Sequence, residues 1–220
     1  MPLVNTPDDE KRLAAEAAAE LVESGMTVGL GTGSTVAHLL PALARRSLEN
    51  IRCVATSVAT EEQARDLGIP VEDFDRLQRL DIAIDGTDEV TPDGWLIKGG
   101  GGAHLREKIV AAAAERFIVI GDSSKPVESL RGPVPLELFG FGAASTLARL
   151  GGDVALRDAP PSPDGGVIAD YRGSGLGDPA ALAARLEADP GVAAHGLFPP
   201  DMVSAVFVAR GDAVDRTSFS

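Results

Sequence analysis

Three short segments of the sequence carry residue types that can do chemistry. They are GLGTGST at 29–35, DGTDE at 85–89 and KGGGGAHLREK at 98–108. The first combines glycines with hydroxyl groups, the second carries several carboxylates, and the third joins a lysine, four glycines and a glutamate. Such groups can bind an anion, transfer protons and stabilise negative charge that develops on an oxygen.

The GLGTGST segment lies where a predicted strand, MTVGLG, meets a predicted helix. Its glycines, Gly33 among them, let backbone N–H groups approach an anion, and the N-terminus of the next helix adds positive potential. A phosphate-binding loop is therefore expected, with an ordinary glycine-rich turn as the alternative. A dinucleotide site is disfavoured because the spacing is not G-x-G-x-x-G and the next strand, IRCVAT, ends without an acidic residue. Hydroxyl donors in the loop come from Thr32, Ser34 and Thr35.

The DGTDE segment follows a hydrophobic run, LDIAID, with the pattern of a buried strand. Ile82 and Ile84 share one face of this strand, and Asp85 lies on the other. Asp85 and Asp88 then lie at the carboxyl end of the strand, where open α/β sheets bind ligands. Close carboxylates drive their pKa values apart, which suits proton transfer. A solvated acidic turn is the alternative, and a Mg²⁺ site is disfavoured because no further ligand cluster has suitable spacing.

The KGGGGAHLREK segment holds a glycine run between a predicted strand and a predicted amphipathic helix. Four glycines in a row cost backbone entropy on folding, so close approach of the backbone to a ligand explains them better than a flexible linker does. Lys98 can place a cation at an oxygen, and Glu107 falls in the first turn of the helix, where it can abstract a carbon-bound proton. Arg106 and Lys108 are expected on a solvated helix face, and His104 lies three residues before Glu107.

Composition excludes several classes of protein. The net charge is −13, which disfavours binding to nucleic acid and to anionic membranes. The single cysteine, Cys53, cannot form an internal disulfide and lies in an apolar run, so a buried thiol in a reducing compartment is expected. The N-terminal residues lack the basic and apolar regions of a signal peptide, and no apolar run is long enough to span a bilayer. A soluble cytoplasmic protein is expected.

Strands and helices alternate over the first 125 residues, which predicts an α/β fold with a Rossmann-like, doubly wound parallel sheet. A helix is expected from Thr6, with Pro7 in its first turn, up to Gly25. After Gly132 the order strand, helix, strand, strand, helix, strand predicts a small α+β domain of the split βαβ, ferredoxin-like type. The expected domains are 1–130 with 203–220, where a last strand returns to the first sheet, and a lid-like domain at 131–202.

The ordered set of motifs resembles ribose-5-phosphate isomerase of the A type. It includes GLGTGST, ATSVATEEQARDLGIP, DGTDE, KGGGGAHLREK, FIVIGDSSK and PGVAAHGLF, and so covers nearly the whole chain. The resemblance implies interconversion of D-ribose 5-phosphate and D-ribulose 5-phosphate through an enediolate, in the pentose phosphate pathway. It also implies a Rossmann-like domain with a smaller α/β domain, no cofactor, a sugar phosphate as partner, and a homodimer or tetramer, of which we expect the homodimer. No metal is expected, because no set of histidines or acids has metal-ligand spacing.

The resemblance assigns roles to residues of this chain. Glu107 corresponds to the catalytic base, with Asp85 and Lys98 as further catalytic groups, and Lys11 of the first helix matches a family lysine. Two positions depart from the family pattern: Thr87 stands where alanine is common, and His104 where a small or apolar residue is usual. The substrate-binding residues implied are Thr32, Gly33, Ser34, Thr35, Asp85, Gly86, Thr87, Asp88, Lys98, Gly99, Gly100, Gly101 and Lys125.

Two other classes of function stay open at the level of the sequence. One is a sugar-phosphate sensor that binds without turnover, although the acidic first helix argues against a DNA-binding segment. The other is a related enzyme, either an amino-sugar phosphate deaminase, which needs a suitable histidine, or an acyl-CoA transferase, which needs a glutamate nucleophile in a different loop. The spacing from the glycine run to Glu107 favours the isomerase.

Overall fold

The computed structural model describes residues 6–219, which form two compact units. The first unit holds the chain up to Thr87, Arg106–Lys125 and the chain from Asp201 on. The second unit holds Asp88–Leu105 and Pro126–Pro200. This division differs from the expected domains at residues 88–105, 126–130 and 201–202. Strand pairing explains the first difference, because strand β5 (Leu96–Ile97) pairs with β11 (Leu197–Phe198) late in the chain.

The first unit is built on a six-stranded sheet with the order β13-β12-β6-β3-β1-β2. Its strands are β1 (Thr27–Leu30), β2 (Arg52–Ala55), β3 (Ile82–Gly86), β6 (Phe117–Asp122), β12 (Ala205–Arg210) and β13 (Ala213–Ser218). All neighbours are parallel except β12 and β13, which form an antiparallel hairpin. The predicted parallel α/β sheet is confirmed, and so is the return of the last apolar run, which forms β12. The edge strand β13 was not predicted.

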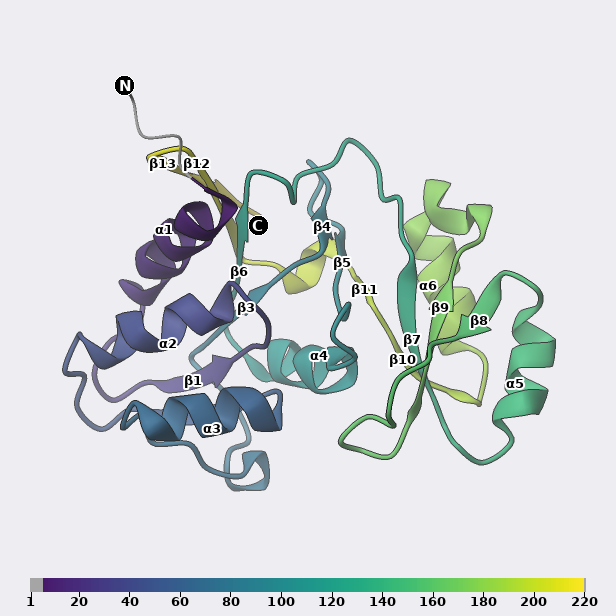
Figure 1. Ribbon diagram of the computed structural model, residues 1–220, viewed down its shortest axis with the longest axis horizontal. Helices are drawn as coiled ribbons and strands as arrows, with labels where there is room; N and C mark the ends of the chain where they lie inside the picture. Colours follow the sequence, from purple (N-terminus) through teal and green to yellow (C-terminus); the bar gives the residue numbers. More distant parts are fainter. Residues whose placement is uncertain (1–5, 220) are drawn as a thin grey trace. The chain divides into compact units, whose positions relative to one another are not determined.

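Helices accompany this sheet, and the first of them begins directly after Thr6, as the sequence indicates. They are α1 (Pro7–Ala19), α2 (Val36–Ala44), α3 (Val58–Asp66) and α4 (His104–Ala113), with a 3₁₀ turn η1 (Phe74–Arg76) (Figure 1). Thr6 caps α1, and its side chain and that of Asp9 exchange hydrogen bonds with each other's backbone, forming a capping box. The prediction that α1 extends to Gly25 was wrong. The chain tightens after Ala19 through bonds from Leu21 and Val22 to carbonyls three residues back, which ends the α-helical pattern.

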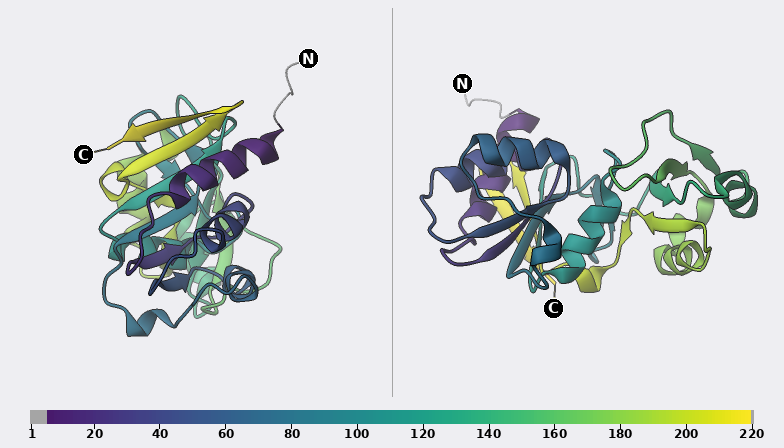
Figure 2. Two further views of the ribbon diagram at one scale, coloured as in Figure 1. Left: turned by 90° about the vertical axis from the view of Figure 1, so that its left-hand side faces the viewer. Right: turned by 90° about the horizontal axis from the view of Figure 1, so that it is seen from below.

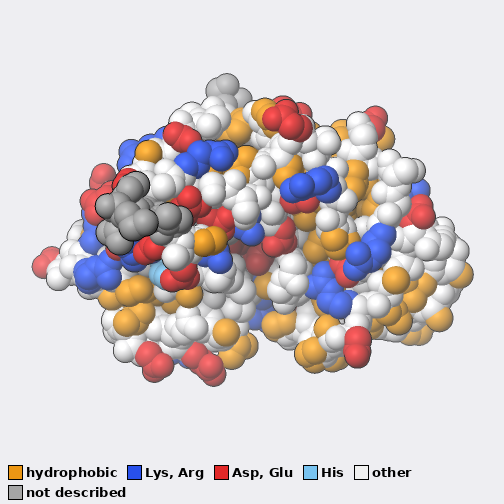
Figure 3. Space-filling view, turned by 45° about the horizontal axis from the view of Figure 1, so that its top comes forward, with side chains coloured by type: hydrophobic (Ala, Val, Ile, Leu, Met, Phe, Trp, Pro, Cys, Tyr) orange, Lys and Arg blue, Asp and Glu red, His pale blue; other side chains and the backbone are white. Residues whose placement is uncertain are grey.

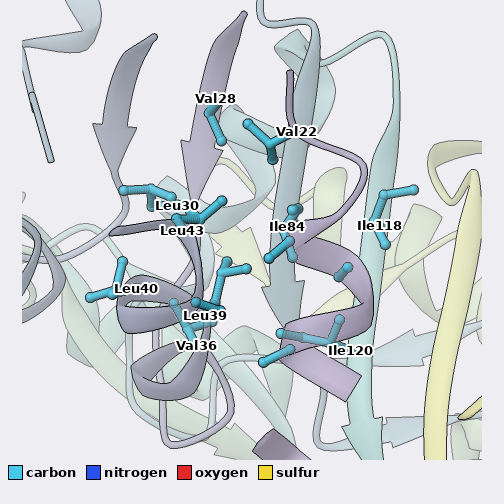
Figure 4. Close-up of a cluster of buried hydrophobic side chains, with 14 of the residues drawn as sticks. Val22, Val28, Leu30, Val36, Leu39, Leu40, Leu43, Ile84, Ile118 and Ile120 are labelled. Carbon is cyan, nitrogen blue, oxygen red and sulfur yellow. The ribbon is translucent and has the colours of Figure 1, made fainter. Parts of the chain in front are cut away.

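One face of the sheet packs against α1 and α2. Val28 and Leu30 of β1 point into a cluster with Ile84, Ile118 and Ile120 of neighbouring strands (Figure 4). The cluster also takes Val22 from the turn after α1, the alanines of α1, and four side chains of α2: Val36, Leu39, Leu40 and Leu43. Burying each large aliphatic side chain stabilises the fold by about 1.5–3 kcal/mol. Helix α1 also runs beside the β12–β13 hairpin, as Figure 2 shows.

The other face of the sheet is covered by α4. A Cβ at Gly29 of β1 would overlap with Val110 of this helix and contact Leu80 and Ala83. Gly29 therefore lets α4 approach the sheet closely. With both faces covered, β3 is buried along nearly its whole length, as expected of a parallel strand.

The second unit has a four-stranded antiparallel sheet of order β10-β7-β9-β8. Its elements are β7 (Val134–Leu138), α5 (Ala143–Leu150), β8 (Val154–Leu156), β9 (Val167–Tyr171), η2 (Ser174–Gly177), α6 (Pro179–Glu187) and β10 (Val192–His195). Counted along the chain, this is a βαββαβ unit with spatial order 4-1-3-2, the predicted ferredoxin-like pattern. A separate sheet, β11-β5-β4, adds β4 (Glu89–Val90), and the turn η3 (Pro200–Met202) follows β11.

Within residues 6–219, no helix combines the length and the apolar character needed to cross a membrane. Acidic and basic side chains lie among one another on the face drawn in Figure 3. Binding of an anionic ligand by this acidic protein therefore depends on local hydrogen-bond donors and positive charges.

Candidate active site

The glycine-rich loop after β1 is fixed against Asp85. The carboxylate of Asp85, which is 3% exposed, accepts the N–H of Thr32 at 3.0 Å and that of Gly86 at 2.7 Å, both at Oδ1. A Cβ at Gly31 would overlap with this carboxylate. Glycine at 31 thus permits the close approach, and the loop and the end of β3 form one hydrogen-bonded unit.

A group of four hydroxyls holds the other side of the loop. Thr32 Oγ1 lies 2.8 Å from the hydroxyl oxygens of Thr56 and Ser57 and 3.2 Å from that of Thr60. Thr60 in turn donates to the carbonyl of Gly31 at 2.9 Å. These three partners of Thr32 were not predicted, although Ser57, whose side chain caps α3 by accepting the N–H of Thr60, has the residue type of an N-cap. The Thr32 hydroxyl, expected to face a ligand, bonds within the protein.

The remainder of the loop leads directly into α2. Gly33 is exposed with a φ of +115°, Ser34 is exposed, and Thr35 is buried just before Val36 opens the helix. Exposed backbone and a hydroxyl at a helix N-terminus are the components of an anion site. A phosphate site at this loop stays a prediction, with these groups as its donors.

The two aspartates of DGTDE have different partners. Asp85 bonds within the first unit, as described, whereas Asp88 is exposed, belongs to the second unit and accepts the N–H of Gly100 at 2.8 Å. Gly86 is half-buried and Thr87 is buried between them. Asp88 therefore organises the glycine run, while Asp85 organises the loop after β1.

The glycine run after β5 forms a turn that other residues adopt poorly. Gly99 and Gly102 have φ angles of +94° and +80°, and the N–H of Gly102 bonds to the carbonyl of Gly99 at 2.9 Å. Gly100 and Gly101 are exposed. A Cβ at Gly99 would lie 2.5 Å from the Cβ of His104, so the buried histidine packs against the glycine backbone. His104 thus has a packing contact that explains its burial.

Lys98 precedes this turn and is 2% exposed. Its Nζ lies 5.5 Å from the centre of the Phe198 ring, a cation–π distance, and its backbone N–H bonds to Gly196 at 2.9 Å. A lysine is seldom buried without a polar or electrostatic role. Its position at the start of an exposed glycine backbone suits a cation that meets a ligand oxygen.

Glu107 and Lys125 belong to the first unit. Glu107 lies in the first turn of α4, as predicted, and is 5% exposed. Lys125 is half-buried in the turn after β6, and its stem lies along Gly121, where a Cβ would come within 2.9 Å of Cγ. Glu107 lies within a helix and Lys125 lies in a turn directly after a buried strand, which restricts the positions of both.

A buried glutamate that the sequence analysis missed supports the turn before Lys125. Glu10 of α1 accepts the N–H of Ser123 at 2.9 Å and that of Gly211 at 2.8 Å. Hydrogen bonds from the Ser123 side chain, then from the backbone of Gly211 and Ser123, lower the pKa of Glu10. Lys11, the next residue, is half-buried. Nothing local in the sequence distinguishes Glu10 from the other acids of α1.

The described residues were also expected to lack a metal site. Across residues 6–219, no group of three or more His, Cys, Asp or Glu side chains is arranged to hold a metal ion.

The chain is similar to known proteins in both sequence and fold. The family model for ribose 5-phosphate isomerase A (phosphoriboisomerase A) matches residues 52–213. Ribose-5-phosphate isomerase A of Caulobacter vibrioides is 46% identical over 222 residues, covering 95% of this chain and 97% of the relative. The corresponding protein of Roseiflexus sp. is 48% identical over 218 residues, covering 93% of each.

Solved structures agree with the sequence comparison. Ribose 5 phosphate isomerase A from Neisseria gonorrhoeae superposes with a TM-score of 0.93 at 33% identity, covering 99% of both chains. A D-ribose-5-phosphate isomerase in complex with phospho-erythronic acid superposes with a TM-score of 0.91 at 32% identity, covering 97% of this chain and all of the other. The family model and these relatives extend over most of the chain, and the chain therefore belongs to the ribose 5-phosphate isomerase A family.

Proposed function

We propose that this protein interconverts D-ribose 5-phosphate and D-ribulose 5-phosphate through an enediolate, as an enzyme of the non-oxidative pentose phosphate pathway. Family membership supports the reaction, and a relative solved with a phosphorylated sugar acid supports the substrate class. The observation that carries the proposal is Glu107, a 5% exposed carboxylate in the first turn of a helix that directly follows the glycine run. A rigidly held carboxylate is what proton abstraction from carbon requires.

In this proposal the phosphate binds at the loop after β1. Gly33, Ser34 and Thr35 contribute backbone and hydroxyl donors at the N-terminus of α2, and Thr32 keeps the loop in shape through its hydroxyl contacts. Lys125 adds a positive charge. Local donors of this kind offset the net charge of −13, which repels a phosphate at long range.

The proton transfers are assigned to Glu107 and Asp85. Asp85 assists ring opening and moves the proton between the sugar hydroxyl and carbonyl oxygens. Glu107 takes the proton from C2, the electron pair forms the C1–C2 double bond of the enediolate, and Glu107 returns the proton to C1. The carbonyl then stands at C2, so atoms and charge balance without a cofactor. A positioned base accelerates such a step by about 10²–10⁴-fold.

Lys98 and the residues around it are assigned to the sugar oxygens. The ammonium group of Lys98 stabilises the enediolate oxygen, and a donor of this kind contributes about 10²–10³-fold. The backbone of Gly99, Gly100 and Gly101 approaches the sugar, with Asp88 holding the run. Gly86 and Thr87, at the end of β3, are also assigned to binding the sugar.

Exposed aromatic side chains and the single thiol bear on the assembly and location of the protein. Phe141 in the second unit is 98% exposed and Phe139 is 54% exposed, and large exposed apolar side chains favour contact with another protein surface. We propose a homodimer in the cytoplasm, where the single thiol stays reduced. Light scattering of the purified protein after size exclusion tests the dimer, and a monomer at all concentrations would exclude it.

The decisive test is conversion of ribose 5-phosphate by purified protein in EDTA, with Glu107→Gln alongside. Rapid conversion by the wild type alone supports both the reaction and the base, without an essential metal. Absence of conversion with tight binding of the sugar phosphate would replace the enzyme with a sensor that binds without turnover.

A further inference from the structure

Arg157 follows β8 and has no role in the proposed chemistry, yet it reaches the glycine run. Its Nη1 donates to the carbonyl of Gly100 at 2.8 Å. The other side of the guanidinium pairs with Asp170, with Nη2 2.5 Å from Oδ1 and Nε 3.3 Å from Oδ2. Arg157, Gly100 and Asp170 all lie in the second unit.

The ion pair fixes the direction of the guanidinium. Asp170 lies on β9, its side chain is 10% exposed, and it also accepts Nη2 of Arg172 at 3.3 Å. The backbone N–H of Arg157 bonds to Ile168 on the same strand at 2.9 Å. A planar guanidinium paired at two nitrogens has one orientation, so its remaining donor points in a defined direction.

Gly100 is consequently held by hydrogen bonds at both its N–H and its carbonyl group. Asp88 accepts its N–H at 2.8 Å, and Arg157 donates to its carbonyl at 2.8 Å. Four consecutive glycines have more backbone freedom than any other residues, and Gly99 and Gly102 take positive φ angles. Two tethers on one exposed glycine greatly reduce the number of conformations open to the run.

We propose that Arg157 is a positioning residue that holds the glycine run after Lys98 in the conformation that binds the sugar phosphate. The inference rests on the proposed function. If the run samples other conformations without the tether, the apparent dissociation constant rises in inverse proportion to the competent fraction. Bound substrate orders the run again, so turnover from the saturated enzyme changes little.

The test compares Arg157→Ala with Arg149→Ala. Arg149 forms a similar two-nitrogen pair in the same unit, with Asp189 at 2.7 Å and 2.9 Å, and its guanidinium also donates to the hydroxyls of Ser145 and Thr146. For Arg157→Ala we expect the KM for ribose 5-phosphate to rise about tenfold, with kcat within about twofold of the wild type. For Arg149→Ala we expect neither constant to change.

Two results overturn the inference: a KM for Arg157→Ala within twofold of the wild type, or a loss of kcat at unchanged KM, which indicates loss of folded enzyme alone. Arg157→Lys keeps the positive charge but lacks the planar guanidinium that pairs through two nitrogens. Its KM should therefore lie between those of the wild type and Arg157→Ala. If Arg157→Ala does not fold, Arg157→Lys decides by the same criteria.

Hydrogen exchange separates this inference from the proposed function. Amides of residues 98–102 should exchange faster in Arg157→Ala than in the wild type, and at wild-type rates in Arg149→Ala. Hydrogen exchange needs no turnover, so it tests whether Arg157 restrains the glycine run even if the wild type converts no substrate. Equal exchange rates in all three proteins would overturn the inference that Arg157 restrains the run.

Discussion

The carboxylate of Asp85 occupies the space that a side chain at position 31 would need. Asp85 is buried at the end of β3, and Gly31 begins the loop after the neighbouring strand β1. The N–H of Thr32, one residue on, bonds to the same carboxylate. One glycine thereby couples the predicted phosphate loop to a predicted catalytic group.

Gly31→Ala should impair both stability and catalysis, because the methyl group displaces the Asp85 carboxylate. Overpacking of this kind costs about 1–3 kcal/mol in the free energy of unfolding. Denaturant unfolding and the isomerase assay measure the two effects. Gly152→Ala is the control, since a Cβ there meets nothing within 4 Å. Equal behaviour of the two variants would contradict the close packing.

Glu107→Gln should reduce kcat by about 10²–10⁴-fold, because the amide cannot accept the proton from carbon. The amide keeps the size of the side chain, so substrate affinity should stay within a few-fold. Steady-state kinetics and a direct binding titration measure both. Glu115→Gln, at an exposed glutamate just beyond the same helix, should be as active as the wild type. Ordinary turnover by Glu107→Gln would disprove its assignment as the base.

Lys98→Ala should lower kcat more than it weakens binding, since the enediolate carries more charge on oxygen than the substrate does. A loss of about 10²–10³-fold in kcat is expected. Steady-state kinetics of the wild type and of Lys98→Ala measure the changes in kcat and in KM, which are then compared. A change in KM alone would assign Lys98 to binding rather than to the transition state.

Glu10 should make stability fall in acid. Its folded-state pKa is lowered below the ordinary value of 4.5, so its contribution is fully present above pH 4.5 and is lost as the pH falls through the folded-state pKa. Glu10→Gln should therefore lose less stability than the wild type on acidification. Unfolding free energies at pH 7 and in acid measure this, with the exposed Glu128→Gln as control. If the free energy of unfolding fell equally with pH in the wild type and in Glu10→Gln, Glu10 would not be the source of the acid sensitivity.

Cys53 should resist alkylation in the folded protein. Burial, with a smaller effect from Glu72, raises the pKa of its thiol from 9.0 to about 12. Little reactive thiolate is then present at neutral pH. Mass spectrometry after iodoacetamide treatment should show modification only in denaturant. Rapid modification of the native protein would mean that β2 is more open than its burial indicates.

Much of the fold follows from local pattern. Alternating apolar strands and amphipathic helices identify the parallel sheet, and the order of elements after Gly132 identifies the ferredoxin-like unit. The end of α1 was misjudged because Gly25 has the sequence signal of a helix end, while the chain leaves the helix several residues earlier. The domain limits also differ, because the pairing of β5 with β11 joins segments about a hundred residues apart, which no local pattern reports.

The family, the fold class and the positions of the chemistry-bearing segments could be inferred from the sequence, because residue type, order and spacing are properties of the chain. The partners that hold those segments became visible in the folded protein. Glu10 meets Ser123 and Gly211 across 113 and 201 residues, and Arg157 meets Gly100 across 57. These pairings arise when packed sheets and helices bring distant backbone together, so a single acid or arginine carries no local sign of them.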